Sequence, residues 1–282
     1  MVRLSTTVLL EMLLLLLAAS SSRAAATKSA YTEVFYPSGN LRIQAYLYRP
    51  FGNGPFPVVI YNHGSRQGGE RRSVPQQYIG QLLTKAGYAA LVIERRGYGR
   101  SDGPTVPEEI VGDKQRLVPR LQAETDDVLA SLDYLRTMAF ADMKRIGLMG
   151  WSYGGIITMF TTSRSSVFAV AVNQAGGALT WNGNPDVRAG LIAAAEKTTT
   201  PTLLQVAQND RTTASITTVG EILSRRGVRH RTVIYEPFAP RQVARDVPPG
   251  HRIFSAEGVN VWERDVLEFL GLYLGAGSRE TR

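Results

Sequence analysis

Short β-rich runs alternate with longer helical patterns along this chain, and this alternation constrains the fold more than any other feature. Such an order is typical of a mostly parallel sheet with helices on both faces. The predicted strands cover residues 32–36, 41–49, 58–61, 89–94, 146–151, 167–173, 202–207 and 231–235. The predicted helices cover 74–86, 121–138, 153–162, 186–197, 216–226 and 259–274. We therefore predict an α/β fold built on one mostly parallel, eight-stranded sheet.

The length of 282 residues fits one such sheet, because α/β domains commonly reach this size without splitting. We expect residues 27–282 to form a single domain. The segments 103–120 and 176–200 have room for about one helix each. No large lid domain is expected.

The first 26 residues are similar to an export signal. Arg3 supplies a positive start, residues 13–19 are apolar, and residues 24–26 are small. An uncleaved membrane anchor is the alternative, but the apolar run is shorter than the ~20 residues that a spanning helix needs. We expect a signal peptide over 1–26, a secreted or periplasmic location, and no stable membrane insertion after cleavage. The sequence leaves the oligomeric state open.

The composition excludes several classes of site. The net charge is +8, but the densest cation clusters are only the pairs at 71–72, 95–96 and 225–226. A nucleic-acid-binding protein usually presents a compact basic stripe, so we expect no nucleic-acid partner. The chain has no cysteine, which excludes disulfides, thiol nucleophiles and thiolate metal sites. No metal and no organic cofactor is implied.

Gly150 to Gly154 read Gly-Trp-Ser-Tyr-Gly, a pattern typical of a nucleophile elbow. In that motif a serine sits on a tight turn from a strand to a helix, and small residues on either side permit the turn. Ser152 follows a predicted strand and precedes an apolar helical pattern, as the motif requires. Ser101 lies in a second match, but it is separated from its strand and runs into Pro104. We therefore predict Ser152 as the nucleophile.

A serine nucleophile needs a base, and the sequence offers three histidines. His230 lies between two arginines and is interpreted as a surface residue, whereas His63 is expected to hold a loop in shape. His251 follows the last predicted strand in a loop that contains Pro248, Pro249 and Gly250. A loop beyond the sheet edge can fold back over the elbow, so we predict His251 as the base. An exposed loop histidine is the alternative.

A carboxylate must orient the base and stabilise its protonated form. Asp210 begins the loop at the carboxyl end of the predicted strand 202–207, and we predict it for this role. Its alternative role is a helix cap. Asp246 and Glu236 are rival acids that no strand end fixes. The order serine, acid, histidine is that of α/β-hydrolases and differs from the chymotrypsin and subtilisin orders.

The transition state also needs donors for the developing oxyanion. We predict the backbone amides of Tyr153, which follows the nucleophile, and of Ser65, in the loop after the strand ending near Tyr61. Trp151 and Trp181 are candidates for the wall of a substrate pocket, with ordinary packing as the alternative for each.

These motifs resemble the α/β-hydrolase superfamily, in particular its dienelactone-hydrolase-like and prolyl-oligopeptidase-like members. The resemblance rests on the segments 61–65 (the family's oxyanion loop), 96–101 (its arginine-glycine loop), 150–155 (its elbow), 201–210 (its acid strand) and 250–251 (its histidine loop). It covers nearly all of the chain after the signal. Dienelactone hydrolases proper use a cysteine, which this chain lacks, and the related oligopeptidases carry an additional propeller domain that this length does not accommodate.

We therefore expect a serine hydrolase that cleaves carboxylic esters of small molecules through an acyl-enzyme. A peptidase or amidase with the same triad is the first alternative. A non-catalytic binding protein on the same scaffold is the second, because fold does not fix function.

Overall fold

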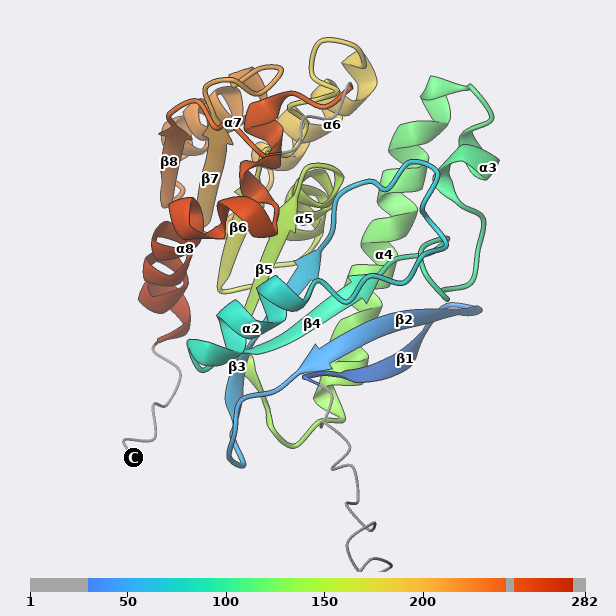
Figure 1. Cartoon of the computed structure of the whole chain (residues 1–282), viewed down its shortest axis with the longest axis vertical. Coiled ribbons are helices and arrows are strands. Elements are labelled where there is room, and N and C mark those ends of the chain that lie inside the picture. Colours follow the sequence, from blue (N-terminus) through green and yellow to red (C-terminus); the bar gives the residue numbers. More distant parts are fainter. Residues whose placement is uncertain (1–29, 242–245, 276–282) are drawn as a thin grey trace, which may run out of the picture.

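A computed structural model describes residues 30–241 and 246–275 of the chain (Figure 1). Its eight strands are β1 (Thr32–Ser38), β2 (Leu41–Tyr48), β3 (Phe56–Asn62), β4 (Ala89–Glu94), β5 (Ala141–Trp151), β6 (Val170–Gln174), β7 (Thr202–Ala207) and β8 (His230–Tyr235). They form one sheet in the order β1-β2-β4-β3-β5-β6-β7-β8. Strands β1 and β2 pair with their neighbours in antiparallel fashion, and all other pairs are parallel.

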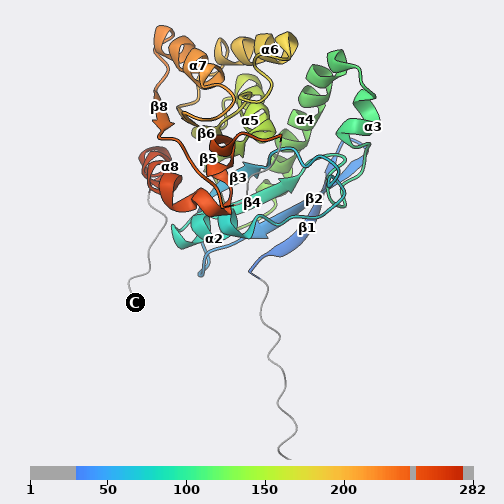
Figure 2. The ribbon, with the colours of Figure 1, turned by 45° about the horizontal axis from the view of Figure 1, so that its top comes forward.

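Helices cover both faces of the sheet. The α-helices are α2 (Gln77–Lys85), α3 (Val106–Ile110), α4 (Leu117–Arg136), α5 (Tyr153–Arg164), α6 (Pro185–Ala195), α7 (Ala214–Arg225) and α8 (Val259–Leu274). Three short 3₁₀ helices are η1 (Lys114–Arg116), η2 (Pro249–Phe254) and η3 (Ala256–Gly258). Figure 2 shows α2 and α8 on one face and α4 to α7 on the other. The predicted mostly parallel, eight-stranded sheet is confirmed, and no large lid is evident in the described ranges.

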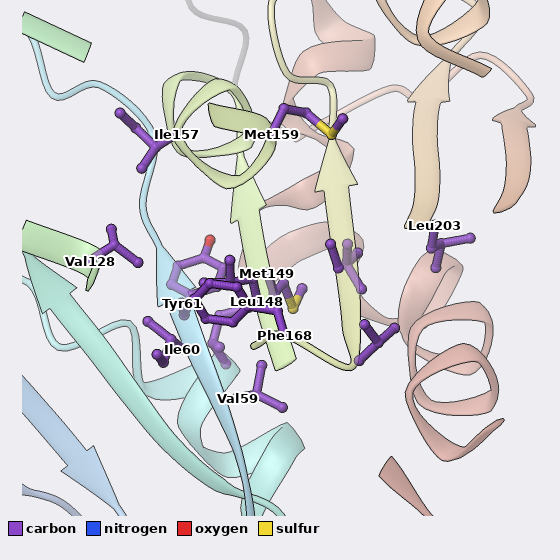
Figure 3. Packing of buried hydrophobic residues seen from close by; sticks show 14 of the residues in the cluster. Val59, Ile60, Tyr61, Val128, Leu148, Met149, Ile157, Met159, Phe168 and Leu203 are labelled. Atoms are coloured by element: carbon purple, nitrogen blue, oxygen red, sulfur yellow. The ribbon is translucent and has the colours of Figure 1, made fainter. Parts of the chain in front are cut away.

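The core lies on both sides of the central strands. Every residue of β3, β4 and β7 is buried, as the continuous apolar runs of these strands predict. Figure 3 shows side chains of β3 and β5, among them Ile60, Tyr61 and Leu148, packed with side chains of α4 and α5 such as Val128 and Ile157. This packing makes the sheet a rigid base for the loops at its carboxyl edge.

Two boundaries differ from the predicted ones in informative ways. Helix α4 begins at Leu117, before the predicted start at 121. Pro119 is tolerated there because the N–H groups of the first turn have no helical acceptor, so the missing N–H of proline costs no hydrogen bond. His251 lies in η2, whereas a plain loop was predicted.

The predicted signal peptide, 1–26, falls outside the described residues. No helix among the described residues has the length and apolar character to cross a bilayer.

Candidate active site

Ser152 occupies the sharp turn between β5 and α5. Its backbone has φ 58° and ψ −118°, a strained conformation for a residue with a side chain. The turn brings Gly154 so close to β3 that a Cβ added there would lie 1.9 Å from the carbonyl oxygen of Asn62. Only glycine fits at that position, and this explains one of the two small residues in the motif. The turn lifts the serine hydroxyl above the carboxyl edge of the sheet.

The structure brings Ser152, His251 and Asp210 together. The Nε2 atom of His251 lies 2.7 Å from Oγ of Ser152, and its Nδ1 atom lies 2.7 Å from Oδ2 of Asp210. A carboxylate only accepts hydrogen bonds, so Nδ1 carries the proton and Nε2 of the neutral ring accepts from the serine hydroxyl. His251 is 2% exposed, and the other two residues are 9% exposed each. The arrangement can therefore move a proton from the hydroxyl to a ring that is already oriented.

Asp210 is held by the loop that follows β7. Its amide donates to the carbonyl of Ala207, and its Oδ1 accepts from the amide of Arg211 at 2.6 Å. Thr213 is the N-cap residue of α7, so Asp210 does not have the alternative role of capping that helix. The rival acid Glu236 accepts a hydrogen bond from the side chain of Gln208 instead.

Two contacts fix the loop that carries His251. A Cβ added to Gly250 would lie 2.5 Å from the amide nitrogen of Asp210, so this glycine lets the histidine loop pack against the acid's loop. The Nε1 atom of Trp151 donates to the carbonyl oxygen of His251 at 3.1 Å. The residue before the nucleophile thus holds the backbone of the base.

Ser101 and His230, which were not predicted as catalytic residues, make contacts elsewhere in the fold. Ser101 is buried, and its hydroxyl donates to the carbonyl of Glu94 and accepts from the amide of Gln44 at 2.8 Å. The ring of His230 lies beside the carbonyl of Val228 at the start of β8. Neither side chain contacts the triad.

His63 belongs to the loop that lies next to the serine. Its Nδ1 donates to the carbonyl of Gly64 at 2.6 Å, and its Nε2 accepts from Nη2 of Arg66 at 2.8 Å. Burial, followed by the nearby Arg95 and Arg66, lowers the pKa of His63 well below its ordinary value of 6.5. The ring is therefore neutral and holds the loop in shape.

The predicted oxyanion donors lie on either side of the nucleophile. Ser65 lines the same pocket as Ser152, and a Cβ on the neighbouring Gly64 would lie 3.3 Å from the Cβ of Ser152. Tyr153 is the first residue of α5, where backbone N–H groups have no helical acceptor. Within the described ranges the amides of Ser65 and Tyr153 donate to no protein acceptor. Both are available to an oxyanion.

A pocket of about 290 Å³ opens over the triad. It is lined by Gly64, Ser65, Trp151, Ser152, Leu179, Val247, His251, Arg252 and Ser255. Trp151 lines this pocket as predicted. Trp181 does not: it is 7% exposed and packs in the core, whereas Leu179 lines the pocket. The described residues hold no cluster of side chains suited to a metal ion.

Comparison with known proteins places these features in context. Residues 76–186 match the sequence model of the Prolyl oligopeptidase family. The matched stretch includes the elbow at Ser152 and ends before Asp210 and His251.

Two curated relatives match parts of the chain. The quorum-quenching protein AidA of Acinetobacter baumannii is 28% identical over 142 residues, which are 50% of this chain and 42% of that protein. A putative carboxymethylenebutenolidase of Synechocystis is 29% identical over 163 residues, which are 53% of this chain and 61% of that protein. The chain thus spans less than two thirds of either relative's length.

Solved structures cover almost all of the chain. The acylaminoacyl peptidase of Pyrococcus horikoshii has a TM-score of 0.66 at 19% identity and covers 89% of this chain, which spans 43% of that protein. The esterase Pf2001 of Pyrococcus furiosus has a TM-score of 0.61 at 18% identity and covers 87% of this chain, which spans 93% of that protein. This chain has the fold of these α/β-hydrolases. The match to the Prolyl oligopeptidase family and the hydrogen bonds at Ser152 together support a serine hydrolase.

Next to the predicted oxyanion loop, the protein contains a buried charge network that sequence reasoning missed. Arg95 donates to the carbonyl of His63 at 2.9 Å and pairs with Glu124 at 2.6 Å. Glu124 also accepts from Arg120 at 2.7 Å and from the hydroxyl of Tyr153 at 3.1 Å. Arg95 and Glu124 are fully buried. The only signal in the sequence is that Arg95 directly follows a buried strand, where an unpaired charge would be unfavourable.

This network connects the two sides of the oxyanion site. Arg95 supports the loop that carries Ser65, and Glu124 binds the side chain of Tyr153, whose amide is the other predicted donor. Burial, followed by the charge of Glu124, raises the pKa of the Tyr153 hydroxyl well above its ordinary value. The hydroxyl therefore stays protonated and donates to Glu124.

Proposed function

We propose that this protein cleaves small carboxylic esters through an acyl-enzyme on Ser152. The observation that carries the proposal is the continuous hydrogen-bonded relay from Ser152 through His251 to Asp210 at the floor of a pocket. Such a relay activates a hydroxyl that is otherwise scarcely ionised near neutral pH.

The proposed reaction has two halves. Oγ of Ser152 attacks the ester carbonyl while Nε2 of His251 takes its proton, and Asp210 stabilises the imidazolium. The amides of Tyr153 and Ser65 bind the negative oxygen of the tetrahedral intermediate. The C–O bond to the alcohol breaks, and His251 returns the proton to the departing oxygen. Water then attacks the acyl-enzyme by the same route, which releases the acid and restores the serine.

The size of the pocket favours small esters over larger substrates. It holds about 290 Å³ and is lined by short side chains, by Trp151 and by the aliphatic Leu179 and Val247. This volume of about 290 Å³ lies just below the range for small-molecule sites, which runs from about 300 to 1,000 Å³. It fits a short ester.

A peptidase or amidase is the second candidate, and the match to the Prolyl oligopeptidase family favours it. The two functions are separated by the turnover of an ester and an amide that share one acyl group and one aromatic leaving group. We expect the ester to be hydrolysed with the higher kcat/KM by more than its greater intrinsic reactivity explains. An enzyme that favours the amide after this correction is a peptidase.

We also propose that the protein is exported. The support is the sequence of residues 1–26, with its positive start and short apolar run. Fractionation of cells that express the full chain tests this: we expect a periplasmic or extracellular product that lacks the first residues. Full-length protein in the cytoplasmic fraction contradicts export.

A further inference from the structure

Arg252 directly follows the base in sequence and lines the pocket over the triad. It is partly buried and lines the same pocket as Ser152 and His251. The other arginines of residues 30–241 and 246–275 that are not exposed each donate a side-chain hydrogen bond: Arg66, Arg95, Arg96, Arg120, Arg145, Arg188 and Arg231. Across these same residues, Arg252 has neither a side-chain hydrogen bond nor an ion pair.

Among the described residues, the pocket around Arg252 is lined by no carboxylate. The nine lining residues include one cation, Arg252, and no carboxylate. The one carboxylate of the triad, Asp210, is already bound to His251 on the side away from the serine. The guanidinium of Arg252 has no protein partner among the described residues, so it is available to form charge-assisted hydrogen bonds with an anion that enters the pocket.

We propose that Arg252 binds a carboxylate carried by the ester substrate. The inference rests on the proposed ester hydrolysis and names the class of ester: one with a free carboxylate on its acyl or its alcohol part. One guanidinium balances the single charge of a carboxylate, whereas a phosphate monoester carries about −1.5 to −2 at neutral pH. The planar fork of arginine also matches the two carboxylate oxygens. The hydroxyls of Ser65 and Ser255, on the same pocket wall, are further donors for it.

Two pairs of esters test this inference. In the first pair the charge is on the alcohol part: 4-acetoxybenzoate is compared with neutral 4-acetoxybenzamide. In the second it is on the acyl part: the mono-4-nitrophenyl ester of adipic acid is compared with the 4-nitrophenyl ester of adipamic acid. For each compound kcat/KM is measured after subtraction of the uncatalysed rate.

We expect the anionic member of at least one pair to be preferred. In Arg252→Gln the ratio of anionic to neutral kcat/KM falls by about 10- to 100-fold, the range for loss of a charge-assisted hydrogen bond. Arg252→Lys retains a larger ratio than Arg252→Gln, because it keeps the charge. Arg229→Gln is the matched control: Arg229 is exposed, its side chain makes no hydrogen bond or ion pair among the described residues, and its loss leaves the ratio unchanged.

The outcomes separate this inference from the proposed function. Labelling of Ser152 by a fluorophosphonate is measured in the same samples. If Ser152 is labelled and neutral esters are hydrolysed, but Arg252→Gln leaves both ratios unchanged, the carboxylate inference is overturned and ester hydrolysis stands. If Ser152 is not labelled and no ester turns over faster than with Ser152→Ala, the proposed function is wrong and the inference falls with it.

Discussion

The indole of Trp151 donates a hydrogen bond to the carbonyl oxygen of His251, 100 positions further along the chain. This bond joins the residue before the nucleophile to the backbone of the base. The two rings also lie near one another, with centroids 5.8 Å apart. Trp151 is thus a positioning residue for the base as well as part of the pocket wall.

Replacement of Trp151 by phenylalanine tests that role. Trp151→Phe removes the donor but keeps an aromatic ring, so we expect kcat to fall by about tenfold, as for loss of one hydrogen bond of about 1.4 kcal/mol. Trp181→Phe is the control, because Trp181 packs in the core and has no contact with the triad. Steady-state kinetics on one ester checks both. If the two variants have equal kcat, Trp151 does not position the base.

Asp210 is expected to set the tautomer of His251. Asp210→Asn presents an amide that can donate to Nδ1, so the ring then carries its proton on Nε2 and cannot accept from Ser152. We expect kcat to fall by about 10⁴-fold with little change in the circular dichroism spectrum. Asp246→Asn and Glu236→Gln, at the rival acids, should stay near the unmutated rate. A larger loss in either of these than in Asp210→Asn would reassign the acid.

The buried network under the oxyanion loop should stabilise the fold. Glu124→Gln removes the negative charge that Arg95 and Arg120 share, and both guanidinium groups are fully buried. We expect the free energy of unfolding to fall by about 3 to 5 kcal/mol in urea titrations. The exposed pair of Arg225 and Glu196 is the control. Glu196→Gln should change the free energy of unfolding by less than about 1 kcal/mol. Equal effects would mean that the buried network contributes no more than a surface pair.

The neutral ring of His63 predicts a pH dependence of stability. Its pKa is lowered in the fold, so below pH 6.5 the unfolded chain takes up the proton and the folded protein does not. Stability from this group is therefore present above pH 6.5 and is lost as pH falls below it, by at most about 1.4 kcal/mol per pH unit. We expect a smaller loss between pH 7.5 and 5.5 in His63→Asn than in the unmutated protein.

Glu94 opposes the loss of stability that His63 causes as pH falls. Burial raises the pKa of Glu94 despite its ion pair with Arg66, so proton uptake by Glu94 favours the folded state as pH falls. The unmutated protein and His63→Asn both contain Glu94, so the difference between their slopes of stability against pH reports the effect of His63. If both slopes are equal, His63 is not held neutral by the fold.

The sequence predicted the features that depend on local pattern. The apolar runs of β3, β4 and β7 mark buried strands because no residue in them faces water. Ser152 and Asp210 were found because each lies where such a strand ends, and parallel strands bring their carboxyl ends to one edge. His251 was found by elimination among three histidines.

The features that depend on packing between distant segments were missed. The pairing of Arg95 with Glu124 joins residues 29 positions apart, on a strand end and a helix, and neither residue type indicates burial by itself. Trp181 was predicted in the pocket but packs in the core, since the direction of a ring after a tight turn is set by tertiary contacts. The guanidinium of Arg252 has no hydrogen-bond partner in the described ranges, and this is recognisable only when its neighbours in the pocket are known.

The identity of the serine that reacts with a fluorophosphonate tests the central claim most directly. The folded protein is incubated with the probe, and the modified peptide is mapped by mass spectrometry in the unmutated chain, Ser152→Ala, Ser101→Ala and His251→Ala. We predict a single adduct on Ser152, no adduct in Ser152→Ala, unchanged labelling of any folded Ser101→Ala, and labelling slowed by at least about 10³-fold in His251→Ala. An adduct on another serine, or fast labelling of Ser152 without His251, would contradict the account.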